Sequence, residues 1–521
     1  MTRHATDLHL GQIWPSREEF HELARNRRLI PVARKVLAPD ITPVGLYRHL
    51  CASKPGTYLF ESAEHDGRWG RWSFIGVDSA SSVITRDGVT SWQGVCPRGA
   101  METGSFREVM HSALEVLRAD PIEGLPPLTG AFVGSIGWAM AREWEPSITM
   151  SAPREMDVPD ASLILARDVA AIDHSDGSLW LVSNAWNMDG TDERVDWAYD
   201  EACRRVGDMC HRLESSMNPA VWVSASPSSD DLAIQHRTPQ DDFEQSVRDA
   251  KEAIGRGDAF QIVLSQRMDV STQADALDVY SVLRTLNPSP YLYLLRLPDG
   301  VGGDFDVVGS SPETLVRTQG QRVWTYPIAG SRPRGANGSE DHDLAVDLLK
   351  DPKELAEHAM LVDLARNDLS RVCRPESVEV STLMEIKRYS HIQHISSTVT
   401  GIVNEGVDAL DCLVATFPAG TLSGAPKTRA IQLIDELEPC ARGVYGGVVG
   451  YFDLGGDTDF AIAIRTACLK DGRASVQAGA GIVADSVEHT EYVETRNKAA
   501  AALASVLTAA KLTGTWTEPI M

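Results

Sequence analysis

The 521-residue sequence lacks long apolar runs: no stretch approaches the roughly 18 consecutive apolar residues that a membrane-spanning helix needs. The N-terminus lacks the continuous apolar core of a signal peptide. Basic residues are in deficit, because 49 lysines and arginines face 73 aspartates and glutamates, for a formal net charge of −24. An acidic surface repels nucleic acid and anionic membranes, so neither is expected as a partner. Any anionic ligand must therefore bind at a locally basic site.

Cysteine is also scarce. The eight cysteines show no C-x-x-C and no zinc-type spacing, so they are expected to be reduced core residues of a cytoplasmic protein. No internal repeat of fixed period is visible. Hydrophobic residues make up 43 % of the chain, and its length suits two or three ordinary domains or one large two-lobed domain.

The first part of the chain has mostly the pattern of strands. Asp87-Gly88 and Asp176-Gly177 each lie between apolar runs, which predicts two β-hairpins. Helical patterns cover residues 106–117 and 194–213, so an antiparallel sheet with helices against it is expected. Around residues 214–231 the composition becomes rich in Ser, Pro and Asp, which suggests a loop at a boundary between domains. The predicted parts are an N-terminal region, a linker-like segment, a binding region and a tail, at residues 1–214, 215–236, 237–510 and 511–521.

The stretch from Asp351 to Asp368 has a strong helix start, an N-cap aspartate followed by Pro352. Glu354 and Glu357 are three residues apart, so both carboxylates project from one face of this helix. Such close carboxylates repel each other unless a cation lies between them, and Mg²⁺ prefers oxygen ligands of this kind. The plain alternative is that Glu354 is a capping-box residue.

A second pair, Glu491 and Glu494, precedes an Ala-rich helix near the C-terminus. Two such pairs that face each other across a cleft would bind one Mg²⁺. Two unrelated, solvated helix faces are the alternative.

Four glycine-rich clusters, several with basic residues, lie in the second half of the chain, at residues 327–335, 418–427, 445–447 and 479–483. None matches a phosphate loop or a dinucleotide-binding fingerprint. Each alone is typical of a glycine turn, but together they suggest backbone N–H groups that approach an anion closely.

Five motifs occur in a fixed order: P-I-A-G-S-R-P-R-G, D-P-K-E-L-A-E-H, P-A-G-T-L-S-G-A-P-K, A-I-A-I-R-T, and G-A-G-I-V-A-D-S with E-Y-V-E-T-R-N-K-A. Together they closely resemble the chorismate-utilising enzymes, specifically component I of anthranilate synthase. The resemblance covers residues 238–507 and is weaker upstream. It implies a single α+β fold: two facing, mostly antiparallel sheets with helices outside and the active site in the cleft between them.

The resemblance also implies a function. Such an enzyme is the large, aminating subunit that converts chorismate and ammonia to anthranilate and pyruvate in tryptophan biosynthesis. It would use Mg²⁺, take ammonia from a glutaminase subunit (component II) in a hetero-oligomer, and have tryptophan as a possible inhibitor. The chain has no G-x-C-x-G elbow for a glutaminase nucleophile of its own.

Site residues carry over by position. Glu313 resembles the general acid, and a near-neutral pKa would suit the proton transfers of the family's histidine, His394. Arg465 and Tyr445 resemble the groups that hold a substrate carboxylate, which an Arg fork binds well. Glu357 and Glu494 resemble direct Mg²⁺ ligands, with Glu354 and Glu491 as companions. The other implied pocket residues are Gly330, Ser331, Thr421, Gly479, Gly481 and Lys498.

Two positions separate the branches of the family. Water-adding members carry a lysine base where Gln261 stands, and aminodeoxychorismate synthases carry a nucleophilic lysine where Ala329 stands. Since ammonia needs no such base, amination is favoured, with Gln261 at the reaction site. Serines at 331 and 396 depart from the pattern near the site. A 2-amino-2-deoxyisochorismate synthase of a specialised pathway therefore remains an alternative, as does a non-catalytic chorismate or tryptophan sensor.

The resemblance implies a regulatory tryptophan site away from the active site. Glu61 and Ser62 would meet the amino-acid head group, and the segment Pro290, Tyr291 and Leu292 would line the indole. Because side chains alternate along a strand, Phe60 is expected to face away from the ligand.

Overall fold

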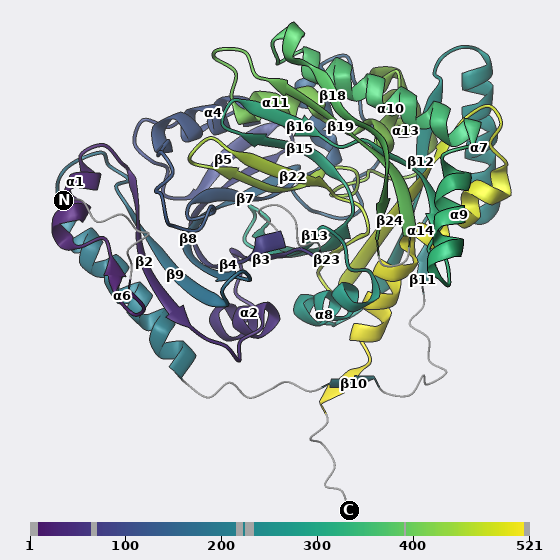
Figure 1. The fold of residues 1–521 in the computed structure, drawn as a ribbon. Coiled ribbons are helices and arrows are strands. Elements are labelled where there is room, and N and C mark those ends of the chain that lie inside the picture. The colour runs from purple at the N-terminus through teal and green to yellow at the C-terminus, as the bar shows by residue number, and fades with distance from the viewer. Residues whose placement is uncertain (1–8, 64–69, 215–221, 225–233, 390–391, 515–521) are drawn as a thin grey trace, which may run out of the picture.

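The computed structural model describes residues 9–63, 70–214, 222–224, 234–389 and 392–514. The strands form two facing sheets, and every strand pairing in the described part is antiparallel (Figure 1). The strands of the first sheet, in spatial order, are β11 (Ile234–His236), β12 (Gln261–Ser271), β24 (Arg473–Ile482), β23 (Thr466–Lys470), β14 (Asp304–Ser311), β13 (Tyr291–Pro298), β3 (Thr57–Glu61), β4 (Trp72–Arg86), β8 (Ala161–Asp173), β9 (Ser178–Trp186), β2 (Leu29–Leu37) and β1 (Ile13–Trp14).

The second sheet shares β4 and β8 with the first. Register shifts between Gly76 and Ser81 mark the part of the β4–β8 ladder where both strands pass from one sheet into the other. The remaining strands of the second sheet are β6 (Thr103–Gly104), β5 (Val89–Gly94), β7 (Ala131–Ile136), β21 (Val448–Asp453), β22 (Thr458–Ile462), β15 (Thr314–Gln319), β16 (Arg322–Thr325), β19 (Ile392–Ile402), β17 (Ile328–Pro333) and β18 (Glu379–Arg388). The short β20 (Gly424–Ala425) pairs with β12.

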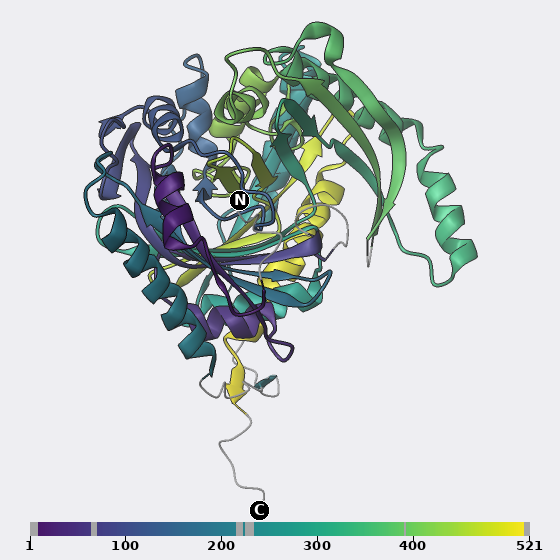
Figure 2. The same cartoon turned by 60° about the vertical axis from the view of Figure 1, so that its left-hand side comes forward.

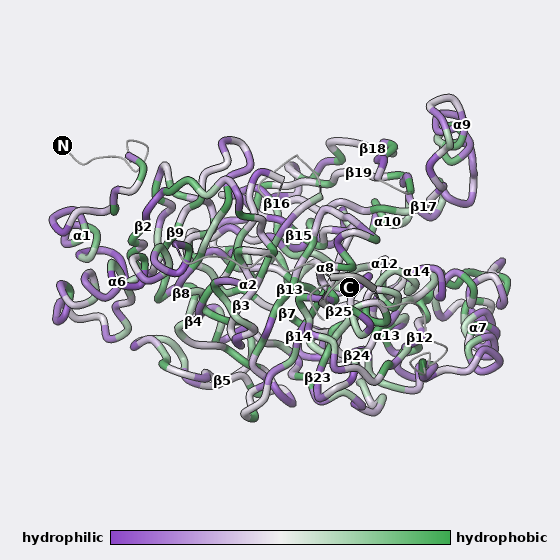
Figure 3. Tube along the Cα trace, turned by 90° about the horizontal axis from the view of Figure 1, so that it is seen from below, coloured by the Kyte–Doolittle hydropathy of each residue, from purple (hydrophilic) through white to green (hydrophobic). Residues whose placement is uncertain are grey.

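Helices cover the outer faces of both sheets, and apolar side chains of the two sheets meet between them, among them Phe60, Tyr293 and Tyr451. Against the first sheet lie α1 (Arg17–Ala24), α2 (Pro43–Cys51), α6 (Val195–Glu214), α8 (Ala276–Leu286) and α14 (Glu488–Ala509). Against the second sheet lie α4 (Phe106–Leu117), α10 (Pro352–Ser370) and α11 (Ala409–Thr416), with α9 (Gly338–Leu348) next to β17. Helices α7 (Gln240–Gly255), α12 (Gly420–Ser423) and α13 (Lys427–Leu437) pack against β12 of the first sheet, and α5 (Ala141–Trp144) follows β7. Hydrophobic residues concentrate in the central strands, whereas α1 and α7 are mainly hydrophilic (Figure 3).

The local predictions from turn and cap residues are confirmed. Asp87 and Gly88 both have positive φ, 52° and 77°, and connect the paired residues Arg86 and Val89, which is the geometry of a tight hairpin turn. The Asp176-Gly177 turn likewise joins β8 to β9. The helix expected over 106–117 is α4 with the same bounds, and the one expected over 194–213 is α6.

The N-terminal region is interleaved with the rest of the chain. Strand β3 pairs with β13, with Glu61 opposite Leu292, and β7 pairs with β21. The early strands therefore lie in the same layers as the strands of the second half (Figure 2). The division at residue 214 stays a prediction about sequence regions, and both sheets cross it.

Most of the linker-like segment 215–236 and the tail after Gly514 lie outside the described residues. The described pieces are strands: β10 (Trp222–Ser224) pairs with β25 (Leu512–Gly514), and β11 pairs with β12. No helix in the described ranges is both long and apolar enough to span a membrane.

Candidate active site

Helix α10 begins as the sequence predicts. The Asp351 side chain accepts hydrogen bonds from the backbone N–H groups of Lys353 and Glu354, at 3.0 and 3.3 Å, and Pro352 is the first helical residue. Glu354 turns toward Arg332 of β17, with 3.5 Å between Nη1 and Oε1. Burial, and then the neighbouring charge of Glu357, raise the pKa of Glu354. Glu354 therefore faces the interior of the site. A capping-box glutamate would instead bond back to the backbone at the start of the helix.

The second glutamate pair lies in the first turns of α14. Glu491 is buried, and Glu494 forms an ion pair with Lys498 at 2.6 Å. Burial chiefly raises the pKa of Glu491, and the charges of Lys353 and Lys498 oppose this rise. Because Lys353 belongs to α10, its influence shows that the starts of α10 and α14 are near each other.

The two glutamate pairs provide four carboxylates, and carboxylate oxygens are the ligands that a hard divalent cation prefers. Within the described ranges, however, no three acidic, histidine or cysteine side chains form a cluster that could hold a metal ion. Their charges are instead balanced by Arg332, Lys353 and Lys498. The donor set fits Mg²⁺, but the predicted coordination sphere is not assembled.

Glu313 is held in the turn between β14 and β15, with 9 % of its surface exposed. The Thr421 hydroxyl donates a hydrogen bond to Glu313 Oε1 at 2.9 Å. Burial raises the pKa of Glu313 to about 7, against weaker lowering by Thr421 and Lys498. A carboxyl that still carries its proton near neutral pH can act as a general acid, as the sequence predicts.

His394 lies on β19, with Nδ1 2.9 Å from the carbonyl oxygen of Gly330. Because a carbonyl only accepts, Nδ1 carries the proton and Nε2 keeps its lone pair. Burial, with a smaller contribution from the charges of Arg465 and Lys498, lowers the pKa of His394 to about 4. The expected near-neutral pKa is therefore wrong: His394 is neutral at physiological pH, and its Nε2 lone pair is available to a proton.

Two basic residues of the site are Arg465, which immediately precedes β23, and Lys498 of α14. Lys498 Nζ donates to the Gly479 carbonyl at 3.2 Å, and the Arg465 guanidinium donates to the Lys498 carbonyl. A Cβ atom on Gly479 would lie 2.8 Å from the Tyr445 hydroxyl, so the close approach of Tyr445 requires glycine there. Arg465 and Lys498 thus supply two cationic groups, which an anionic ligand requires, to the site of an otherwise acidic protein.

Gln261 begins β12 and joins the two sides of the site. Its Nε2 donates to Glu357 Oε1 of α10 at 3.1 Å, while its buried Oε1 has no partner. Gln261 faces inward, because only 3 % of it is exposed. A Cβ on Gly481 would lie 2.5 Å from Gln261 Nε2, so glycine leaves room for this contact. Ser331 is exposed, and pairs with His394 across the β17–β19 ladder.

The structure thus links several of the predicted residues: Glu313 with Thr421 and Lys498, His394 with Arg465 and Lys498, and Gln261 with Glu357. It also adds residues that the sequence reasoning missed. Arg332 bonds to Asp347 and to the helix cap Asp351, both at 2.9 Å, and approaches Glu354. The available signal was its place inside the motif at 327–335.

The proposed regulatory segments are neighbours, but their side chains face different ways. Glu61 accepts hydrogen bonds from Tyr280 at 2.5 Å and from Arg284 at 3.0 Å, and Leu292 lies opposite Glu61 in the ladder. Phe60 faces the central core, which confirms its predicted orientation. Tyr291 also packs in that core and donates to Asp459 at 2.8 Å. The tyrosine ring is therefore on the opposite face from Glu61.

A family model described as chorismate binding enzyme matches residues 42–504. The chain belongs to the chorismate-binding enzymes. Among curated members, it is 50 % identical to anthranilate synthase component 1 of Mycolicibacterium smegmatis, over 95 % of this chain and 94 % of that protein. It is 49 % identical to anthranilate synthase component 1 of Arthrobacter globiformis, over 96 % of this chain and 95 % of that protein.

Solved structures of chorismate-binding enzymes have the same fold. Anthranilate synthase component I from Streptococcus pneumoniae superposes with a TM-score of 0.70 and 34 % identity, over 83 % of this chain and 92 % of that one. The menaquinone-specific isochorismate synthase of Escherichia coli gives a TM-score of 0.67 over 94 % and 98 % of the two chains. At 18 % identity, this second likeness concerns the fold alone.

Proposed function

We propose that this chorismate-binding enzyme is the aminating component of an anthranilate synthase, which converts chorismate and ammonia to anthranilate and pyruvate. The observation that carries this proposal is the division of acid and base between Glu313 and His394. One is a buried carboxyl with a pKa of about 7, and the other a neutral imidazole with a free Nε2. The near-half identity to anthranilate synthase component 1 proteins supports the same reaction.

The reaction has two steps with different proton requirements. Ammonia adds at C2 of the substrate ring while the C4 hydroxyl leaves, and Glu313 donates a proton to that leaving oxygen. The second step removes the C2 proton and expels pyruvate, and His394 Nε2 is suited to take this proton. Arg465 and Lys498 would bind the substrate carboxylates.

Mg²⁺ is proposed as the cofactor, held by Glu357 and Glu494 with Glu354 and Glu491 beside them. A bound Mg²⁺ would withdraw electrons from the ring through a substrate carboxylate. The polypeptide's own part is to hold these four carboxylates on two neighbouring helices, with Gln261 orienting Glu357 and Lys498 balancing Glu494.

The test is an assay of the purified chain with chorismate and Mg²⁺. Ammonium salts should give fluorescent anthranilate, and glutamine alone should give none, because a glutaminase partner is needed to release ammonia. A non-aromatic aminated product would instead identify the 2-amino-2-deoxyisochorismate synthase. No product from ammonium would contradict the proposal, and glutamine-dependent activity by the isolated chain would contradict the need for a partner.

Replacing His394 with alanine is expected to slow pyruvate elimination by about 10²–10⁴-fold, since it removes the positioned base. Amination should change much less, so a non-aromatic aminated intermediate should accumulate and be detected by mass. His111→Ala, at an exposed histidine 2.8 Å from Asp408, is the control and should behave as wild type. An equal loss in both steps would show that His394 acts in binding or folding.

Tryptophan is proposed as a feedback inhibitor that binds beside β3, with Glu61 and Ser62 at its head group. Glu61 must then exchange its bonds to Tyr280 and Arg284 for the ligand, so a weak response is expected. Ser62→Arg should abolish inhibition without changing the uninhibited rate, whereas Ser339→Arg, at the exposed start of α9, should not. Titration of activity with tryptophan measures both. No inhibition of wild type even at concentrations far above cellular ones would contradict this site.

A further inference from the structure

A small cavity of about 40 Å³ lies beside Glu313. Glu313 and Thr421, which are bonded to each other, line it together with Asp368 and Thr416. About 10–15 Å³ is enough for one water molecule when polar partners are present. The remaining lining residues are Thr314, Leu315, Thr325, Tyr326, Pro327, Leu361, Leu364, Ala365, Ala419, Gly420 and Ile462. The cavity is therefore both large enough and polar enough to hold water in contact with the proposed acid.

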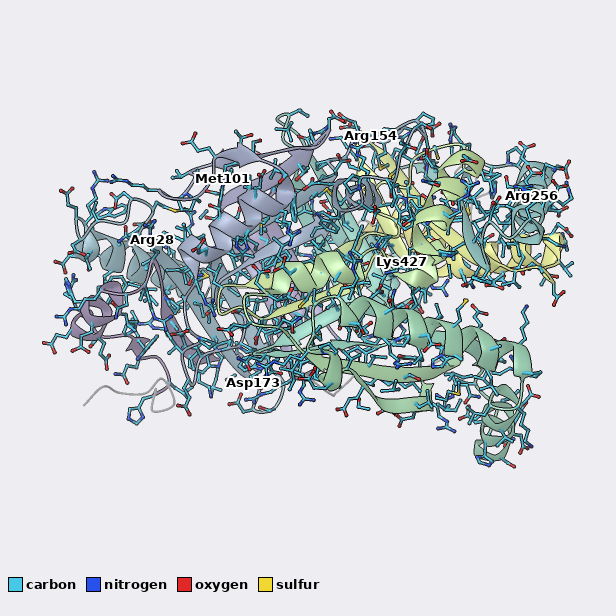
Figure 4. The ribbon with its side chains drawn as sticks, turned by 90° about the horizontal axis from the view of Figure 1, so that it is seen from above. Arg28, Met101, Arg154, Asp173, Arg256 and Lys427 are labelled. Carbon is cyan, nitrogen blue, oxygen red and sulfur yellow. The ribbon has the colours of Figure 1, made fainter. Side chains whose placement is uncertain are left out.

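A buried ion pair adjoins this cavity. Lys427, labelled in Figure 4, lies at the start of α13. It donates to Asp368 Oδ2 of α10 at 2.7 Å and to the Thr416 carbonyl at 3.0 Å. Only 7 % of Asp368 is exposed. Asp368 and Lys427 are the last residues of the sequence motifs L-V-D-L-A-R-N-D and G-T-L-S-G-A-P-K, and the proposed site has no other role for either residue. Because an apolar pair of similar size often gives equal stability, burying these charges suggests a role besides folding.

In the proposed amination step, Glu313 loses a proton that must be replaced, and the cavity beside it could supply that proton. The C4–O bond breaks with its electrons on oxygen, which takes the Glu313 proton and leaves as water. The C2–N bond forms from the ammonia lone pair, and the nitrogen then releases a proton to solvent. Glu313 is left as a buried carboxylate and must regain one proton before the next turnover.

We propose that the cavity holds water that returns a proton to Glu313, and that Asp368 and Lys427 are positioning residues that orient this water. The inference rests on the proposed function. Asp368 offers a carboxylate acceptor at the cavity wall, and Lys427 fixes that carboxylate from the other side. The proton thus reaches Glu313 without passing through the substrate.

The first test is Asp368→Asn, assayed with saturating chorismate and ammonium. We expect kcat to fall by about 10–10²-fold, less than the full contribution of a general acid. The ratio of rates in H₂O and D₂O should rise, because proton return becomes limiting, and small carboxylic-acid buffers should restore part of the rate. The KM for chorismate should stay unchanged. Asp363→Asn, at an exposed position of the same helix paired with Arg366 at 2.9 Å, is the matched control.

A second variant, Ala365→Leu, fills the cavity and keeps the ion pair, so it gives the same answer if Asp368→Asn folds poorly. A loss of kcat in either folded variant without a change in the isotope ratio and without buffer rescue would overturn the inference. Full activity in both would do the same. If the wild-type chain forms no aminated product at all, the proposed function fails first, which is a distinguishable result.

Discussion

Glu313→Gln is expected to lower kcat for anthranilate formation by about 10²–10⁴-fold, because glutamine keeps the shape of the side chain but cannot donate a proton to the leaving oxygen. The hydrogen bond from Thr421 can still reach the amide oxygen, so folding and chorismate binding should be retained. Steady-state assays with chorismate and ammonium measure the effect. Glu385→Gln, on the exposed side of β18, is the control. A rate within a few-fold of wild type would show that another group protonates the leaving oxygen.

The pKa of Glu313 also predicts how the activity depends on pH. The proposed acid Glu313 would act in its protonated form, so activity should fall as pH rises through its pKa of about 7. His394 acts in its neutral form, so activity should fall on the acid side only as pH drops toward its pKa of about 4. A profile of kcat/KM for the free enzyme should show both limbs. In Glu313→Gln the residual activity should lose the alkaline limb, and a limb that persists there would belong to another group.

Glu357→Gln and Glu494→Gln should each lower Mg²⁺-dependent turnover by more than about 100-fold, since even residues behind the direct ligands often contribute 10–100-fold. Each change removes one anionic oxygen ligand from a hard cation. Calorimetric titration with Mg²⁺ gives a readout independent of activity and should show weakened binding. Glu436→Gln, at an exposed position of α13, should leave binding intact. Wild-type turnover in excess chelator would rule out the metal site.

Local features of the fold could be predicted because they depend on a few adjacent residues. The Asp-Gly turns and the Asp351-Pro352 helix start are of this kind. The motifs also predicted charged residues, among them Glu357 and Lys498, that have further predicted site residues as partners in the structure. The state of His394 could not be predicted, since its pKa is set by burial and by Arg465 and Lys498, which are distant in sequence.

In the proposed regulatory segment, too, contacts between residues distant in sequence could not be predicted from local patterns. The partners of Glu61 lie 219 and 223 residues further along the chain, in a helix that no local pattern connects to β3. Strand alternation correctly placed Phe60, but it cannot reveal which polar groups another element brings to Glu61. The predicted head-group residue Glu61 is therefore already hydrogen-bonded to other residues of the protein.

The pairing of β3 with β13 has a consequence for biosynthesis of the protein. Glu61 meets Leu292 in the ladder, so one edge of β3 has no partner until some 230 further residues have been made. At about 5–20 residues per second, the ribosome needs roughly 10–50 s to supply them. During that time an apolar strand edge is open to pairing with other chains. The nascent chain must therefore be shielded, by chaperones or by its own early helices, before the first sheet can close.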